Sequence, residues 1–315
     1  MLRADAASET VLPFPAGSPP GAVCVRAGGQ GRSRVTVRLE GPGQFMPRSS
    51  IETAYPMALI EHILQVKGPY YLCDEIARDE DPTYTQATLE PDIFAYVSEE
   101  EFAGRTLLDF GCGSGASTAI LGRKLPQTRI LGVELNETLL GIARERLAFY
   151  HLEGVQLLTS PSREELPPGL EGVDFVVMSA VYEHLLPRDR ETVLPRLWKL
   201  LRPGGVLFLD QTPHRYFPIE PHTTYLPFIN YLPDAMAHAY ARSLSILARS
   251  DPARPRLLEP CRLGARDLID VWYLGSTLHS YPRGRRAVRW AAKVLQALTG
   301  ICLVPYLALA IRKEV

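Results

Sequence analysis

Short apolar runs alternate with helix-like segments along the middle of the chain. The runs lie at residues 107–110, 129–134, 155–158, 173–178 and 206–210. Continuous apolar runs of this length are typical of strands that are buried on both faces of a sheet. The segments between them, at 117–125, 137–150 and 191–201, have apolar side chains at helical spacing. Strands that alternate with helices predict an α/β fold with a doubly wound, Rossmann-like parallel sheet.

The flanks of this core carry weaker patterns. Residues 1–45 are rich in Gly, Pro, Ala and Ser, which predicts a mobile tail with at most one edge strand. Apolar stripes over 46–104 predict a helical extension whose first helix begins near Ser50. We expect the sheet itself over 105–212, and an acceptor loop and cap over 213–282.

The C-terminal region, residues 283–315, contains 18 uncharged residues at 294–311. A stretch of that length could cross a bilayer. Gly300 and Pro305 divide it, however, so we expect a helix that ends at Thr299 and then a last strand that returns to the sheet, antiparallel to the others. The arginines at 283–289 leave peripheral membrane contact open.

Composition narrows the class of protein. The net charge is −1, which gives no electrostatic reason to expect nucleic acid as a partner. The five cysteines are odd in number and have no C-x-x-C spacing, which indicates a reducing compartment and no zinc site. Because no charged-then-apolar signal opens the chain, we expect a cytoplasmic protein.

A glycine turn follows the first apolar run of the core. Residues 107–115 read Leu-Leu-Asp-Phe-Gly-Cys-Gly-Ser-Gly. Such a turn presents amide N–H groups and the positive end of the next helix, while Asp109 adds a carboxylate, and this mixture suits a zwitterion better than a pyrophosphate. The spacing G-x-G-x-G also differs from the dinucleotide fingerprint G-x-G-x-x-G. A plain packing turn and a nicotinamide-dependent dehydrogenase both remain as alternatives.

Glu134 ends the second core strand, about 20 residues beyond the glycines. A carboxylate at this place accepts hydrogen bonds from both hydroxyls of a ribose, whichever nucleoside cofactor is bound. Glu134 therefore predicts a nucleoside without identifying it.

The glycine turn, with its acid two residues before the first glycine, resembles the first motif of the class I S-adenosylmethionine (SAM) dependent methyltransferases. Glu-His-Leu at 183–185 and Arg-Pro-Gly-Gly at 202–205 are similar to further features of that family, so the resemblance covers about residues 105–212. It implies SAM as cofactor. The family's cofactor contacts correspond to Asp109, which holds the amino group, and to Gly111, Gly113, Gly115 and Glu134. Where the family usually has an acid that reads the adenine, this chain has Ser162, which adds a weaker contact.

Two segments supply candidate catalytic residues, because ligands of open parallel sheets bind at the carboxyl ends of the strands. Glu183 and His184 follow the fourth strand, and a proline-rich loop with His214, Glu220 and His222 follows the fifth. Histidine titrates near neutrality and is the natural base for methyl transfer to a hydroxyl. We rank His184 first, then His222 paired with Glu220, then His214, although each is also compatible with a hydrogen-bonded loop histidine.

The same two segments bear on metal binding and on the acceptor. Some resembling methyltransferases hold a divalent metal with Glu-x-x-Glu-His, but Ala180 replaces the first acid here, so no metal site is predicted. The proline-rich loop resembles a segment of bacterial methyltransferases often linked to glycan or lipid tailoring. The sequence thus predicts O-methylation of a small-molecule, glycan or lipid-linked acceptor. A SAM-binding module without catalysis is the alternative outside enzymes.

Overall fold

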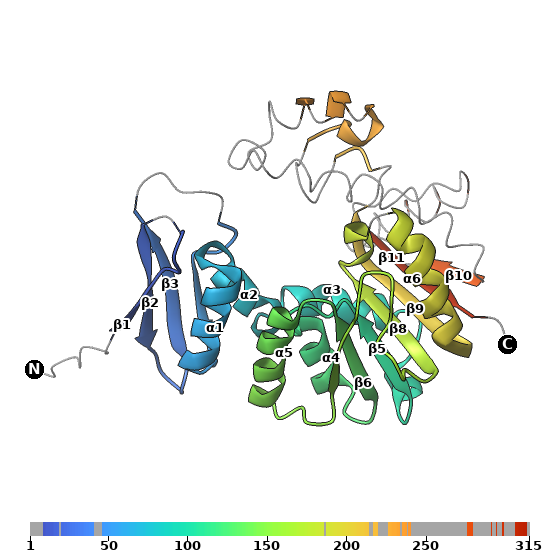
Figure 1. Ribbon diagram of the computed structural model, residues 1–315, viewed down its shortest axis with the longest axis horizontal. Coiled ribbons are helices and arrows are strands. Elements are labelled where there is room, and N and C mark those ends of the chain that lie inside the picture. The colour runs from blue at the N-terminus through green and yellow to red at the C-terminus, as the bar shows by residue number, and fades with distance from the viewer. Residues whose placement is uncertain are drawn as a thin grey trace, which may run out of the picture. The chain divides into compact units, whose positions relative to one another are not determined.

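The computed structural model describes residues 9–18, 20–40, 46–185, 187–213, 217–219, 226–233, 235–237, 239–240, 276–279 and 306–313, together with residues 291, 294 and 298. The chain forms two compact units, and Figure 1 labels most of their helices and strands. The first unit contains Met1–Ala87, Gly113–Arg123 and Asn136–Glu153. The second contains Thr88–Cys112, Lys124–Leu135 and Gly154–Val315.

A seven-stranded sheet forms the centre of the second unit. Its strands are β5 (Thr106–Phe110), β6 (Arg129–Glu134), β7 (Gln156–Thr159), β8 (Val173–Ser179), β9 (Leu201–Pro213), β10 (Ser276–His279) and β11 (Tyr306–Arg312). Their order is β10-β11-β9-β8-β5-β6-β7. Strands β5 to β9 pair in parallel, and β11 runs antiparallel to both of its neighbours. The predicted doubly wound sheet with an antiparallel last strand is confirmed.

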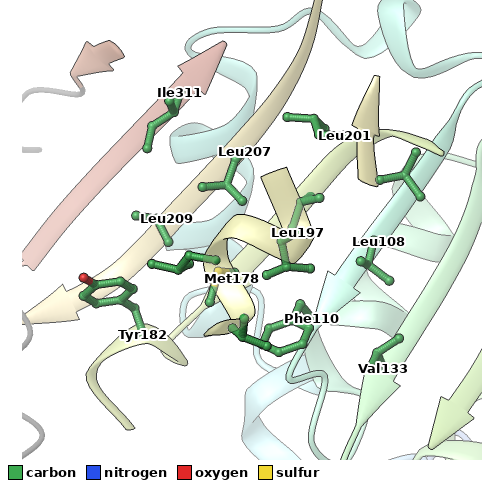
Figure 2. Close-up of a cluster of buried hydrophobic side chains, with 14 of the residues drawn as sticks. Leu108, Phe110, Val133, Met178, Tyr182, Leu197, Leu201, Leu207, Leu209 and Ile311 are labelled. Carbon is green, nitrogen blue, oxygen red and sulfur yellow. The ribbon is translucent and has the colours of Figure 1, made fainter. Parts of the chain in front are cut away.

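Strands β5, β8 and β9 are buried on both faces, which explains their continuous apolar runs. On one face, Val193 and Leu197 of α6 (Pro187–Leu200) pack with side chains of β8 and β9 such as Met178 and Leu207 (Figure 2). On the opposite face, Phe102 of the short 3-10 helix Glu99–Phe102 lies against Phe175 and Phe208, at ring-centroid distances of 4.1 and 6.5 Å. Since alternate residues of a strand face opposite sides, a strand covered on both sides must be apolar throughout.

The first unit corrects the prediction for the N-terminal region. Strands β1 (Glu9–Pro13), β2 (Gly21–Ala27), β3 (Ser33–Leu39) and β4 (Ser50–Thr53) form an antiparallel sheet in that order. The expectation of a tail with at most one edge strand is therefore wrong. The glycines and prolines that suggested it lie mostly between the strands, while alternate residues such as Val23 and Val35 are buried.

Helices pack against this N-terminal sheet. They are α1 (Met57–Lys67), α2 (Pro69–Glu80) and α5 (Glu137–Phe149), and the unit also holds most of α4 (Ala116–Lys124) and the start of α3 (Thr85–Phe94). The first helix was predicted from Ser50. It begins only at Met57 because residues 50–53 pair with β3 instead, and Pro56 is its N-cap.

The C-terminal region partly follows its prediction. The apolar stretch supplies β11, and residues 291, 294 and 298 are helical. Strand β10, within the segment predicted to be a cap, was missed because Ser-Thr-Leu-His contains a single large apolar side chain. Among the described residues no helix is long and apolar enough to cross a membrane. The arginines at 283–289, predicted to favour membrane contact, lie outside the described residues.

Candidate functional site

The strand order places a crevice at one point of the sheet edge. Strands β6 and β7 follow on one side of β5, whereas β8 and β9 lie on its other side. Ligands of doubly wound folds bind where the order reverses in this way, beyond the carboxyl ends of the strands. A cavity of about 260 Å³ lies at that point in the second unit. It is lined by Phe110, Gly111, Val133, Glu134, Ser160, Ser162, Arg163, Ala180, Val181 and His184, among others.

Four predicted site residues therefore meet in one cavity, namely Gly111, Glu134, Ser162 and His184. They come from segments that are far apart in the sequence. Ala180 and Val181 also line the cavity, although neither was predicted to bind a ligand. Their position directly after β8 was the signal that could have identified them.

Gly111 can be no other residue without a local rearrangement. Its φ is 74°, in the left-handed region, and a Cβ added there would lie 2.7 Å from Cγ2 of Val181. The N–H groups of Gly111 and Cys112 both donate to the carbonyl oxygen of Val133, at 2.8 and 3.0 Å. These two N–H groups thus connect the end of β5 to β6. Any backbone N–H groups that bind a ligand must therefore come from residues of the turn after Cys112.

The other two glycines of the turn belong to the first unit, and they differ from each other. Gly115 has a φ of 82°, and a Cβ there would lie 2.8 Å from Cβ of Ala143 in α5. Gly113 has a φ of 56°, and its added Cβ would meet nothing within 4 Å. Gly115 is therefore required by helix packing, whereas Gly113 faces open space that a bound molecule can use. Asp109, in β5, is buried and does not line the cavity, so its predicted contact with an amino group stays a prediction.

Polar groups line the cavity at the ends of β6 and β7. Glu134 is partly exposed, and its Oε1 accepts a hydrogen bond from the N–H of Leu135 at 2.8 Å. Ser162 Oγ accepts from the N–H of Glu164 at 3.3 Å. A carboxylate and a serine hydroxyl that line one cavity fit the hydroxyl-rich nucleoside part of SAM.

His184 and Glu183 lie in the 3-10 helix Tyr182–His184, directly after β8. The His184 side chain is 49% exposed and lines the cavity, whereas Glu183 is fully buried. Thr212 Oγ1 donates to Glu183 Oε2 at 3.4 Å, and Glu183 Oε1 lies 3.8 Å from His184 Nε2. Burial raises the pKa of Glu183 to about 7, despite opposing hydrogen bonds and Arg190. The acid beside the candidate base therefore changes charge near neutral pH.

A second buried acid lies at the end of β9 and was not predicted. Burial, and then the neighbouring carboxyl of Asp92, raise the pKa of Asp210 well above its usual value. Ser179 Oγ donates to Asp210 Oδ2 at 3.1 Å. Ala180 and Gln211, which follow the two strands, have φ values of 53° and 59°. Strained backbone and perturbed acids concentrate at functional sites, so this edge is the candidate acceptor side.

His214, Glu220 and His222 lie outside the described residues. Their role in the acceptor pocket stays a prediction.

Replacing Glu183 with glutamine should stabilise the protein at alkaline pH. The folded protein favours the neutral form of Glu183, because its pKa is higher in the folded state than in the unfolded state. The stability that neutral Glu183 contributes is therefore lost as the pH rises from the unfolded pKa of 4.5 through about 7. We compare the unfolding free energy of Glu183→Gln with that of the parent protein, measured by urea unfolding. The difference in favour of the variant should rise by about 2 kcal/mol between pH 5 and pH 8. Glu164→Gln, at an exposed position, is the matched control. A gain that is equal at both pH values would contradict the prediction.

Comparison with known proteins agrees with this geometry. Residues 108–207 match a family described as a methyltransferase domain. A trans-aconitate 2-methyltransferase from Azoarcus sp. (strain BH72) is 37% identical over 125 residues, which are 40% of this chain and 45% of that protein. Another, from Variovorax paradoxus (strain S110), is 28% identical over 200 residues, 64% of this chain and 69% of the relative. A carboxy-S-adenosyl-L-methionine synthase from Hydrogenovibrio crunogenus is 28% identical over 109 residues, 34% and 43% of the two chains.

The chain spans less than half the length of two of these relatives and about two thirds of the third. The matched region starts at Leu108 in β5 and ends in β9, so it contains the glycine turn and the segment of Glu183 and His184. This match to a methyltransferase domain agrees with the inference from the glycine spacing, which disfavours a nicotinamide cofactor. The family match, the relatives and the strand order together support the resemblance of the chain to the class I SAM-dependent methyltransferases, whose cofactor is S-adenosyl-L-methionine.

Proposed function

We propose that this protein transfers the methyl group of SAM to an oxygen atom of a small-molecule acceptor. The observation that carries the proposal is the shared cavity, where His184 lies with Gly111 and Glu134. A candidate base and candidate cofactor contacts that line one cavity satisfy the first geometric requirement for transfer, which is to bring acceptor and donor together.

In this proposal, the cofactor residues bind SAM and orient it. SAM supplies a methyl group on a positively charged sulfur. Glu134 accepts hydrogen bonds from the ribose hydroxyls, Ser162 contributes a weaker contact, and Gly113 leaves room for the cofactor beside the backbone. Asp109 contacts the amino group of the methionine part. A cavity of about 260 Å³ lies slightly below the range of ligand pockets, which begins at about 300 Å³.

His184 acts as the base for a hydroxyl acceptor. Its imidazole takes the proton from the acceptor oxygen as the new bond to carbon forms, and its exposure lets it pass that proton on to water. The Glu183 carboxyl lies 3.8 Å from Nε2, so its ionised form favours the imidazolium that results. The loop with Glu220 and His222 orients the acceptor.

A carboxylate acceptor is the second candidate. Two of the relatives described above are named for trans-aconitate, a small carboxylic acid. Arg163 lines the cavity and supplies a positive charge for such an acceptor. A carboxylate carries no proton to remove, so this reaction would depend on positioning alone. Glycan and lipid-linked hydroxyl acceptors, suggested by the loop's resemblance, belong with the first candidate.

The experiment is to incubate the purified protein with methyl-labelled SAM and pooled acceptors, either hydroxylated compounds or small carboxylic acids. Mild alkali separates the candidates, because it cleaves methyl esters and leaves methyl ethers intact. We expect alkali-stable label in the hydroxylated pool. Label that alkali releases would favour the carboxylate acceptor. Binding of S-adenosylhomocysteine without turnover in any pool or in cell extract would instead favour a non-catalytic SAM-binding module.

A further inference from the structure

A buried network of charged groups in the first unit has no part in the proposed chemistry. At its centre, Arg146 of α5 is completely buried and lies 3.1 Å from the carboxylates of both Glu75 and Asp79, measured from Nη2 and Nε. Tyr55 OH accepts from Arg146 Nε at 2.8 Å and donates to Asp79 Oδ2 at 2.5 Å. Buried charges are costly to desolvate, and apolar residues of the same size would often be at least as stable. A network of this kind therefore invites a search for a role beyond stability.

The network reaches the glycine turn through one residue, Ser114, which lies between Gly113 and Gly115. Arg146 Nη1 donates to the carbonyl oxygen of Ser114, and Ser114 Oγ donates to Glu75 Oε1. Arg146 Nη2 also donates to Glu75 Oε1 and to the Glu75 carbonyl oxygen, both at 3.1 Å. The Glu75 and Arg146 pair thus holds both the side chain and the backbone carbonyl of this turn residue.

Holding that carbonyl fixes more than one atom. In a planar trans peptide the C=O of one residue and the N–H of the next point in opposite directions. The bond from Arg146 to the Ser114 oxygen therefore directs the N–H of Gly115 to the opposite side, at the start of α4, where amides lack partners within the helix. Glycine itself has little preference between left-handed and right-handed backbone, so Gly113 and Gly115 cannot set this direction alone.

We propose that Glu75 and Arg146 are positioning residues for SAM, and that they hold Ser114 in the orientation in which the glycine turn binds the cofactor. They contact the turn from α2 and α5 and need not touch the cofactor. The proposal concerns cofactor binding alone, so it is tested independently of the acceptor and of the reaction.

Glu75 keeps its negative charge, so the contact of Glu75 and Arg146 with Ser114 persists across the physiological pH range. Burial alone would raise its pKa, but Arg146, then Arg78 and Lys67, outweigh burial and lower the pKa to about 2. Lys67 Nζ lies 3.3 Å from Glu75 Oε2. Glu75 therefore remains a carboxylate throughout the physiological pH range, and this contact does not act as a pH switch.

The test compares the affinity for S-adenosylhomocysteine of two variants of the full chain, Glu75→Gln and Ser114→Ala. Titration calorimetry is carried out well below the melting temperature of each variant, so that a change in affinity reports on the folded protein. We expect each variant to bind about 2- to 10-fold more weakly, the equivalent of one net hydrogen bond. Ser114→Ala leaves the pair of Glu75 and Arg146 intact, so it tests the proposal even if Glu75→Gln does not fold.

Tyr55→Phe is the matched control, because Tyr55 belongs to the same buried network and its hydroxyl is bonded to Arg146 and Asp79 rather than to the glycine turn. It should lower the melting temperature and leave the affinity within about twofold, since it removes two bonds of the network and leaves both bonds to Ser114 in place. Unchanged affinity in folded Glu75→Gln and Ser114→Ala would overturn the proposal. Equal weakening in Tyr55→Phe would also overturn it, because the effect on affinity would then not depend on the contacts with Ser114.

Discussion

Replacing His184 with alanine should lower the turnover number by about 10²- to 10⁴-fold while the protein still binds S-adenosylhomocysteine with affinity within about threefold. The base takes its proton in the transition state, so its loss raises the barrier without changing the ground-state contacts of the cofactor. Single-turnover rates with labelled SAM measure the first effect, and titration calorimetry measures the second. His184 lines the cavity with Glu134, so calorimetry also shows whether the substitution disturbs the cofactor contacts.

Variants of two other histidines test whether the effect is specific to His184. His62 Nδ1 lies 2.8 Å from Glu145 Oε1, and His62 does not line the cavity, so His62→Ala should leave turnover unchanged. His222→Ala should mainly raise the Michaelis constant for the acceptor. If His184→Ala keeps turnover within about threefold and His222→Ala abolishes it, the base lies in the acceptor loop. If neither substitution matters, the acceptor is a carboxylate or the reaction depends on positioning alone.

The strands of the core could be predicted because burial on both faces leaves a simple signal. Phe175 and Met178 lie on opposite faces of β8, yet both are buried, so the run is apolar at every position. The N-terminal sheet has no such runs. In β3, Val35 and Val37 are buried while Arg34 and Arg38 are exposed, and this alternation was the basis for predicting at most one edge strand. Only pairing with β2 and β4, which the sequence does not display, makes these residues a strand.

The candidate site could be predicted where its residues form a local motif, as at Gly111 and His184. Arg146 shows why the rest was missed. Residues 144 and 146 are both arginines on the same helix, but two positions correspond to roughly 200° of rotation, so they face opposite sides. Arg144 is exposed and pairs with Glu137, whereas Arg146 is buried against Glu75. The sequence contains no local feature that distinguishes them, because the partner comes from a distant helix.

The pair of Asp92 and Asp210 was missed for the same reason. The two carboxyls come from α3 and β9, and neither forms part of a motif with the other. Their mutual effect on the pKa of Asp210 exists only after folding brings them together.

Replacing Glu134 with alanine should weaken binding of S-adenosylhomocysteine at least tenfold. Hydrogen bonds to a charged group contribute roughly 1.5–3 kcal/mol each, and alanine removes the acceptor for both ribose hydroxyls, so a tenfold loss remains even if water replaces part of the contact. Glu134→Gln keeps one neutral acceptor oxygen and should fall between the parent and the alanine variant. Titration calorimetry measures all three affinities.

One local contact has to be separated from this effect. Glu134 Oε1 also accepts the N–H of Leu135 at 2.8 Å, so alanine removes a bond at the end of β6 as well as the proposed ribose contact. Circular dichroism and the melting temperature show whether each variant is folded, and Glu164→Ala removes an exposed carboxylate that does not line the cavity. An unchanged dissociation constant in folded Glu134→Ala would mean that the end of β6 does not hold the ribose. The cofactor would then have to be bound by the glycine turn and the segment after β8 alone.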